Sequence, residues 1–92
     1  MIISFIHKGL ERFYLTGAKA GIQPEHASKL RRILTVLETA QVPDDMDLPG
    51  YRLHSLQGNR QGVWSVRVNG NWRITFRFTE QNIELVDYED YH

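Results

Sequence analysis

The sequence predicts an α+β fold, in which an N-terminal strand and two helices pack on a twisted antiparallel β-sheet. Apolar residues recur every three or four positions in the first forty residues, which is typical of helices, and every second position after residue 63, which is typical of strands. The chain has 92 residues, enough for one hydrophobic core. We therefore expect a single domain over residues 1–92.

The first half contains the helices. Residues 1–6 are β-rich and short enough for a strand, and Leu10, Phe13 and Tyr14 then share one face of a helix over about residues 7–19. This helix is expected to end near Gly17 or Gly21. A second helix begins at Pro24–Glu25 and has an apolar stripe formed by Ala27, Leu30, Ile33, Leu34, Leu37 and Ala40. Residues 41–50 contain two prolines and three acids and are expected to form a loop.

The second half contains an antiparallel hairpin around Asn69-Gly70. A two-residue turn there would place apolar and charged residues on the same face of the sheet. An odd loop length, or a bulge with the same effect, would instead make one face wholly apolar. The expected pairs are then Val68 with Trp72, Val66 with Ile74 and Trp64 with Phe76.

This register puts Arg67 directly across from Arg73 on the other face, and like charges in that position destabilise a strand pair. Some anion, from the chain or from a ligand, must offset them. A last strand over residues 83–88 would place Arg73 opposite Tyr88 if its alternation were regular, although Val86 breaks the pattern. Asp90 and His92 would then lie at the end of the arginine-bearing face, which the helices leave open to solvent.

The charge distribution also indicates an anion-binding surface. The net charge is zero, but residues 48–79 contain five Arg and no acidic residue, whereas residues 80–92 contain five acidic residues and no Lys or Arg. Arginine is suited to bidentate contacts with phosphate and to stacking on bases. The alternative is that these arginines pair with the acidic tail and only hold neighbouring strands together.

Composition excludes several classes of site and location. There is no Cys, which excludes a disulfide scaffold, a thiolate metal site and a Cys nucleophile. No run approaches the roughly 20 apolar residues of a membrane span, and the start lacks the features of a signal peptide. We therefore expect a cytoplasmic protein with no membrane partner.

Five residues are of the types needed for metal-free RNA cleavage: His54, Arg73, Asp90, Tyr91 and His92. That reaction needs a base for the ribose 2′-hydroxyl, a cation for the phosphorane charge and an acid for the leaving 5′-oxygen. A metal site formed by His54, Asp90 and His92 is the rival interpretation, although their spacing is no specific ligand signature. His7 and His26 are expected to be surface or packing residues.

Three segments show a family resemblance: MIISFIHKGLERFY, LHSLQGNRQGVWSVRVNGNWRITFRF and VDYEDYH. Over nearly its whole length the chain resembles the HigB toxins of the RelE/ParE superfamily. The resemblance implies a RelE-like fold, with two helices on a twisted antiparallel sheet. It also implies a toxin of a type II toxin-antitoxin system, a ribosome-dependent endoribonuclease that cleaves mRNA in the decoding A site and inhibits translation without a metal or cofactor.

The resemblance assigns roles to residues. It implies His54, Asp90 and His92 as acid/base candidates, Arg73 as the phosphate clamp and Tyr91 as a residue that positions or stacks on the message. The implied partners are a HigA-like helix-turn-helix antitoxin, the mRNA, and the ribosome with its 16S rRNA. Operator DNA is contacted only through the antitoxin.

The predicted RNA contacts extend beyond these residues. Gln57 stands where HigB relatives have Lys, and Arg60 is expected to compensate for the lost cation. Arg67 is expected to contact the message, and the basic helix cluster of Lys29, Arg31 and Arg32 is a candidate contact with ribosomal RNA, unless it is merely a solvated helix face. Two alternative functions stay open: a non-catalytic ParE-like gyrase inhibitor, and a RelE-fold module weakened by the change at Gln57.

Overall fold

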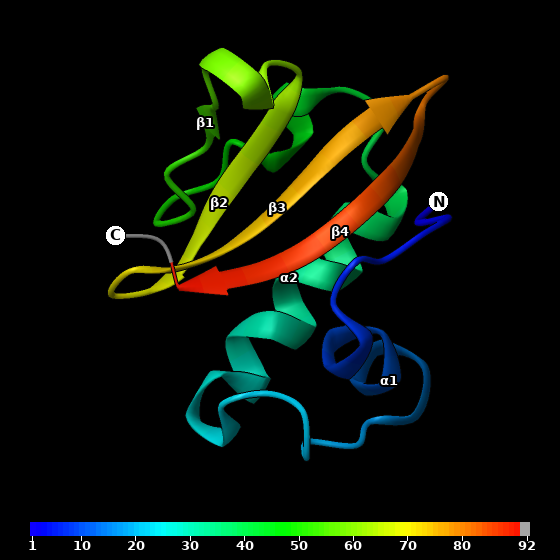
Figure 1. The fold of residues 1–92 in the computed structure, drawn as a ribbon, viewed down its shortest axis with the longest axis vertical. Helices are drawn as coiled ribbons and strands as arrows, with labels where there is room; N and C mark the ends of the chain where they lie inside the picture. Colours follow the sequence, from blue (N-terminus) through cyan, green and yellow to red (C-terminus); the bar gives the residue numbers. More distant parts are fainter. Residues whose placement is uncertain (91–92) are drawn as a thin grey trace.

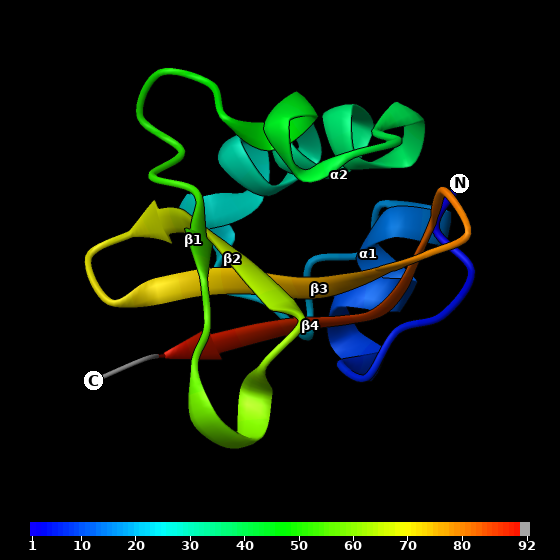
Figure 2. The ribbon, with the colours of Figure 1, turned by 90° about the horizontal axis from the view of Figure 1, so that it is seen from above.

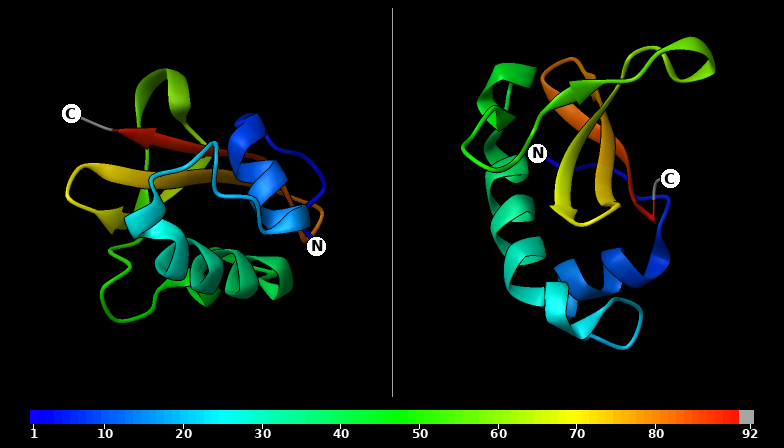
Figure 3. Two further views of the ribbon diagram at one scale, coloured as in Figure 1. Left: turned by 90° about the horizontal axis from the view of Figure 1, so that it is seen from below. Right: turned by 90° about the vertical axis from the view of Figure 1, so that its left-hand side faces the viewer.

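The protein consists of two layers, a four-stranded antiparallel sheet and two helices on one of its faces (Figure 1). The computed structural model describes residues 1–90, so the expected site residues Tyr91 and His92 lie outside the described part of the chain. The helices are α1 (Lys8–Thr16) and α2 (Ala27–Thr39), and the strands in sheet order are β1 (His54–Ser55), β2 (Val63–Asn69), β3 (Trp72–Thr79) and β4 (Asn82–Asp90). Figures 2 and 3 show that α2 runs along one face of the sheet and that neither helix covers the other face. The predicted α+β fold is confirmed.

Both helices begin and end where local sequence signals place them. His7 caps α1, because its Nδ1 accepts a hydrogen bond from the Leu10 amide at 2.9 Å. Gly17 ends α1 in the left-handed region, with φ of 81°, and its amide donates to the Phe13 carbonyl. A 3₁₀ turn, η1 (Pro24–His26), leads into α2. All six residues of the predicted apolar stripe of α2 are buried.

The loop predicted over residues 41–50 is partly ordered as a 3₁₀ turn, η2 (Pro43–Met46). Met46 is fully buried there and joins the core between the helices and the sheet. A single apolar residue among prolines and acids has no periodicity, so the sequence pattern did not identify it as a core residue.

The β2–β3 hairpin contains the bulge that its apolar pattern requires. Trp64 pairs with Phe76 and Val66 with Ile74, as predicted, and the register then shifts between Arg67 and Asn69. The predicted pair of Val68 with Trp72 is wrong, because the bulge puts Asn69 opposite Trp72. The extra residue of β2 keeps one face of the hairpin apolar despite the short turn at Asn69-Gly70. Of the two predicted solutions, the structure uses the bulge.

The predicted partner of Arg73 on the last strand is wrong. Leu85 adopts a positive φ of 56°, and the register of β3 and β4 shifts between Thr75 and Arg77. This bulge moves every later residue of β4 by one position, so that Arg73 lies opposite Glu89 and Tyr88 lies opposite Ile74. Tyr88 is consequently buried against the helices and does not lie on the arginine-bearing face.

The same bulge explains why the expected N-terminal strand is not continuous. Residues 1–6 run parallel to β4 and form only two isolated bridges, Ile2 with Ile83 and Phe5 with Val86. Between the bridges, the Leu85 amide donates to the Ser4 hydroxyl at 2.8 Å, because the bulge turns this amide away from a regular ladder. The segment therefore extends the sheet edge without forming a strand.

Candidate functional site

The face of the sheet that the helices leave open is polar, and we call it the arginine-bearing face. Arg67 of β2 and Arg73 of β3 pair directly across this face, as the sequence predicted. His54 of β1 pairs with Ser65, two residues before Arg67 on β2. Since neighbouring strands lie about 4.8 Å apart and residues rise about 3.4 Å, the Cα atoms of His54 and Arg73 are separated by about 12 Å. The two predicted site residues are thus within reach of a single bound nucleotide chain.

His54 is exposed, and its ring orientation is fixed by a local contact. Its Nδ1 lies 3.2 Å from the Leu53 carbonyl oxygen, which can only accept, so Nδ1 donates the hydrogen bond. In the neutral ring this tautomer leaves a lone pair on Nε2. Nε2 of His54 can therefore accept a proton from a bound hydroxyl group.

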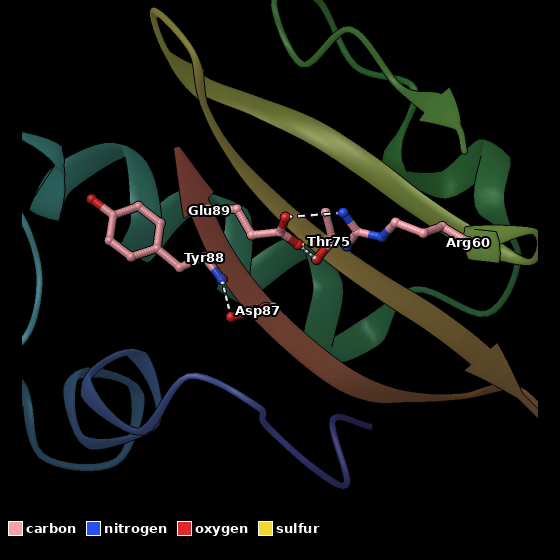
Figure 4. A network of polar contacts seen from close by, with 5 residues as sticks. All are labelled: Arg60, Thr75, Asp87, Tyr88 and Glu89. Carbon is pink, nitrogen blue, oxygen red and sulfur yellow. Dashed lines mark hydrogen bonds and ion pairs between the residues drawn. The ribbon is translucent and has the colours of Figure 1, made fainter. Parts of the chain in front are cut away.

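Glu89 is a member of the site that the sequence analysis did not identify. Its carboxylate accepts a hydrogen bond from Nη1 of Arg60 at 3.0 Å, one from Nη2 of Arg60 at 2.5 Å and one from the Thr75 hydroxyl at 2.8 Å (Figure 4). The Arg60 hydrogen bonds lower the pKa of Glu89 against the opposing effect of burial, and Thr75 adds to the lowering. This carboxylate is ionised, and it lies opposite Arg73. Glu89 is therefore the anion that the Arg67–Arg73 pair was expected to need.

Some of the arginines of residues 48–79 form ion pairs with the acidic tail. Arg60 pairs with Glu89, and Arg77 pairs more loosely with Glu84, at 3.8 Å. The interpretation that the arginines bind the acidic tail is therefore confirmed for these two. Arg67 and Arg73 face each other across the strands and are both partly exposed.

Asp90 lies at the end of β4, opposite Trp72. It is exposed and lines a pocket of about 580 Å³ together with His26, Trp72 and the Asn69–Asn71 turn. Strand alternation puts Asp90 on the same side of β4 as Tyr88, so its expected place on the arginine-bearing face is wrong: the bulge at Leu85 turns it to the side that faces the helices. The predicted site residues His54 and Arg73 share the arginine-bearing face.

Tyr88 and His26 form a buried polar contact behind the site. The Tyr88 hydroxyl lies 2.6 Å from Nδ1 of His26, and the Trp72 ring packs on the Tyr88 ring with centroids 4.6 Å apart. Figure 4 shows Tyr88 and Glu89 pointing to opposite sides of β4. Burial raises the pKa of Tyr88 above its ordinary value, and the Gln23 amide partly opposes this. His26 is the packing residue that the sequence suggested, and together with Tyr88 it ties the end of β4 to the start of α2.

The remaining predicted RNA contacts lie on two other surfaces. Gln57 is exposed and precedes the 3₁₀ turn η3 (Gly58–Arg60). On α2, Nζ of Lys29 lies 4.8 Å from the centroid of the Tyr51 ring, and the Arg31 guanidinium lies 5.4 Å from that of Phe13. Arg32 is exposed, so the basic helix cluster keeps its charges at the surface while its stems cover aromatic rings.

No three His, Cys, Asp or Glu side chains within residues 1–90 gather closely enough to hold a metal ion. The rival metal site includes His92 and so lies partly outside the described residues. None of the described helices has the length and apolar content to cross a bilayer.

Comparison with known proteins gives concordant matches. Residues 3–92 match the family model described as a RelE-like toxin of the type II toxin-antitoxin system HigB. The chain is 38% identical over 92 residues to endoribonuclease HigB of Proteus vulgaris, covering 100% of both chains. It is 34% identical over 94 residues to toxin HigB-1 of Vibrio cholerae, covering 100% of this chain and 98% of that one. The crystal structure of YafQ from E. coli matches 96% of this chain and 89% of its own with a TM-score of 0.63 at 19% identity, which indicates a shared fold.

Proposed function

This chain belongs to the HigB-like family of RelE-like toxins, and we propose that it cleaves messenger RNA in the decoding A site of the ribosome. It is an endoribonuclease of a type II toxin-antitoxin system, as its full-length relatives indicate. The observation that best supports the proposed substrate is the arginine-bearing face, which Arg67, Arg73 and His54 share and which neither α1 nor α2 covers. A single-stranded message fits such an uncovered cationic surface.

The proposed reaction proceeds without a metal. A base removes the proton from a ribose 2′-hydroxyl, the 2′-oxygen forms a bond to phosphorus, and the bond from phosphorus to the 5′-oxygen breaks as an acid protonates that oxygen. The products are a 2′,3′-cyclic phosphate and a 5′-hydroxyl. Nε2 of His54 is suited to the role of base, because Nδ1 donates to the Leu53 carbonyl. Arg73 would stabilise the phosphorane charge.

Asp90, Tyr91 and His92 complete the proposed catalytic set. By their residue types, Asp90 and His92 are the candidates for the acid, and Tyr91 is the candidate for stacking on or positioning the message. The exposed position of Asp90 at the end of β4, directly after Glu89, supports its inclusion. The proposal requires no cofactor.

The proposed RNA contacts divide between message and ribosome. Arg60 and Arg67 on the arginine-bearing face, and Gln57 at the start of the η3 turn, would contact the backbone of the message. The basic helix cluster lies on α2, across the sheet from that face, where it would contact ribosomal RNA. One molecule could then hold both RNAs at the same time.

Membership of a type II family implies a protein antitoxin as partner. We propose that this antitoxin is a HigA-like helix-turn-helix protein, through which the toxin reaches operator DNA without contacting it. The toxin would act in the cytoplasm, where ribosomes translate, as one domain over residues 1–92.

The proposal is tested by expressing the protein in a cloning host and mapping mRNA ends by primer extension on ribosomes programmed with a defined message. Growth arrest together with cuts at a fixed position in the A-site codon supports it. Inhibition of gyrase supercoiling without any codon-linked cut would instead identify a ParE-like toxin. A wild-type protein that permits normal growth and cuts no message would be a weakened module.

A further inference from the structure

The pair between Arg60 and Glu89 links two distant parts of the site. Arg60 belongs to the η3 turn between β1 and β2, whereas Glu89 lies near the end of β4, 29 residues later. In Figure 4 the Arg60 side chain extends from this turn across the sheet toward β4. The pair therefore crosses the arginine-bearing face.

The geometry of this pair is more constrained than that of an ordinary surface ion pair. Both nitrogens of the Arg60 fork donate to the two oxygens of Glu89, and the buried Thr75 donates a third hydrogen bond to the same carboxylate. The Glu89 side chain is 22% exposed and that of Arg60 is 39% exposed. A bidentate contact fixes the plane of the guanidinium as well as its position. The two parallel hydrogen bonds therefore orient Arg60.

The surrounding charges explain why a carboxylate is needed at this position. Glu89 lies directly across from Arg73, which itself lies across from Arg67. Without an anion, three guanidinium groups would share one small face, and repulsion would drive Arg60, which reaches the face from the η3 turn, toward solvent. With Glu89 ionised, Arg60 is held against the face and a net positive charge remains for a phosphate.

We propose that Glu89 is a positioning residue for RNA cleavage, which holds the Arg60 guanidinium in a fixed orientation over the arginine-bearing face. This inference rests on the proposed function, since it assigns Arg60 a contact with the message backbone. Glu89 does not touch the RNA in this account. It acts through Arg60, which belongs to the η3 turn.

The test compares Glu89→Gln with the wild-type protein in cleavage of a message on programmed ribosomes. Glutamine keeps the size of the side chain and removes its charge, so Arg60 is released. We expect kcat to fall by about tenfold to a hundredfold, as for other misplaced groups. KM should stay constant or fall, because the variant carries one more net positive charge. Glu84→Gln is the matched control: it removes the same charge from the same strand, breaks only the pair with Arg77, and should leave kcat unchanged.

Two further variants separate positioning from a general structural effect. Arg60→Lys keeps the charge in the partly exposed turn but cannot form the bidentate pair, and it should lose kcat to a similar degree as Glu89→Gln. Adding Glu89→Gln to Arg60→Gln should cause no further loss, because Glu89 acts only through Arg60. Thermal unfolding midpoints report whether each variant is folded.

The inference is overturned if Glu89→Gln cleaves as fast as or faster than wild type, if Arg60→Lys matches wild type, or if the two glutamine substitutions have additive effects. Should Glu89→Gln fail to fold, Arg60→Lys alone decides the question. A wild-type protein that makes no cut would instead refute the proposed function, so the two failures are distinguishable.

Discussion

Removal of the Tyr88 hydroxyl is a direct test of how the structure holds the end of β4. Tyr88 and His26 are 4% and 5% exposed, and their hydroxyl and Nδ1 atoms lie 2.6 Å apart. Tyr88→Phe preserves the ring packing on Trp72 but leaves Nδ1 of His26 buried without this partner. An unsatisfied buried polar group costs about 1–3 kcal/mol. We therefore expect the free energy of unfolding to fall by about 2 kcal/mol. Since 1 kcal/mol corresponds to about 4–8 °C in a domain of this size, Tm should fall by about 8–16 °C.

The assay is thermal and urea unfolding followed by circular dichroism. A double-mutant cycle with His26→Leu supplies the control, because the double variant has no buried partner left unsatisfied and should be more stable than the sum of the single effects predicts. A loss in Tm below about 2 °C for Tyr88→Phe, or additive effects in the cycle, would refute the reasoning that this hydrogen bond anchors β4.

Three other predictions concern acid stability, packing and ribosome binding. The hydrogen bond from Tyr14 holds the pKa of Glu38 below its usual 4.5, so the ionised carboxylate stabilises the fold above that pH, and this stabilisation is lost as the pH falls through the lowered pKa. Glu38→Gln should therefore be less stable than wild type at neutral pH and equally stable in acid, as measured by urea unfolding. A methyl group on Gly9 would lie 2.6 Å from the Gly21 carbonyl oxygen. Gly9→Ala should therefore lower the free energy of unfolding by about 2 kcal/mol in the same assay, although alanine favours helices. An unchanged free energy of unfolding would show that the two backbone segments separate easily. Arg32→Gln should weaken the salt dependence of ribosome binding: the slope of log affinity against log salt concentration should become shallower by about one. An unchanged slope would show that the basic helix cluster does not contact ribosomal RNA.

The sequence predicts those parts of the fold that a periodic pattern specifies. The apolar stripe of α2 could be recognised because six residues repeat at helical spacing, and all are buried. The bulge between β2 and β3 could be deduced because only that register leaves Val66 and Ile74 on a common apolar face. In both cases one buried face constrains every residue of the element.

The bulge at Leu85 could not be predicted in the same way. Leucine rarely adopts a positive φ, so nothing local indicates that this residue turns the strand. The break of alternation at Val86 was the available signal, and it pointed to irregular pairing without giving its direction. One shifted position replaced Tyr88 with Glu89 opposite Arg73, and so the partner of Arg60 was missed. His54 and Arg73, which lie before the bulge, share one face, although no periodic pattern in the sequence predicts the register of His54.

The central claim is that the arginine-bearing face stabilises the transition state of RNA cleavage. The most direct measurement is the single-turnover rate of message cleavage on programmed ribosomes by wild type and by Arg73→Ala, with the ends of the products identified. The account predicts a 2′,3′-cyclic phosphate as product and a rate for Arg73→Ala that is slower by about 10²- to 10³-fold, as for other lost charge-stabilising groups. Equal rates for the two proteins, or cuts that leave a 5′-phosphate, would contradict it.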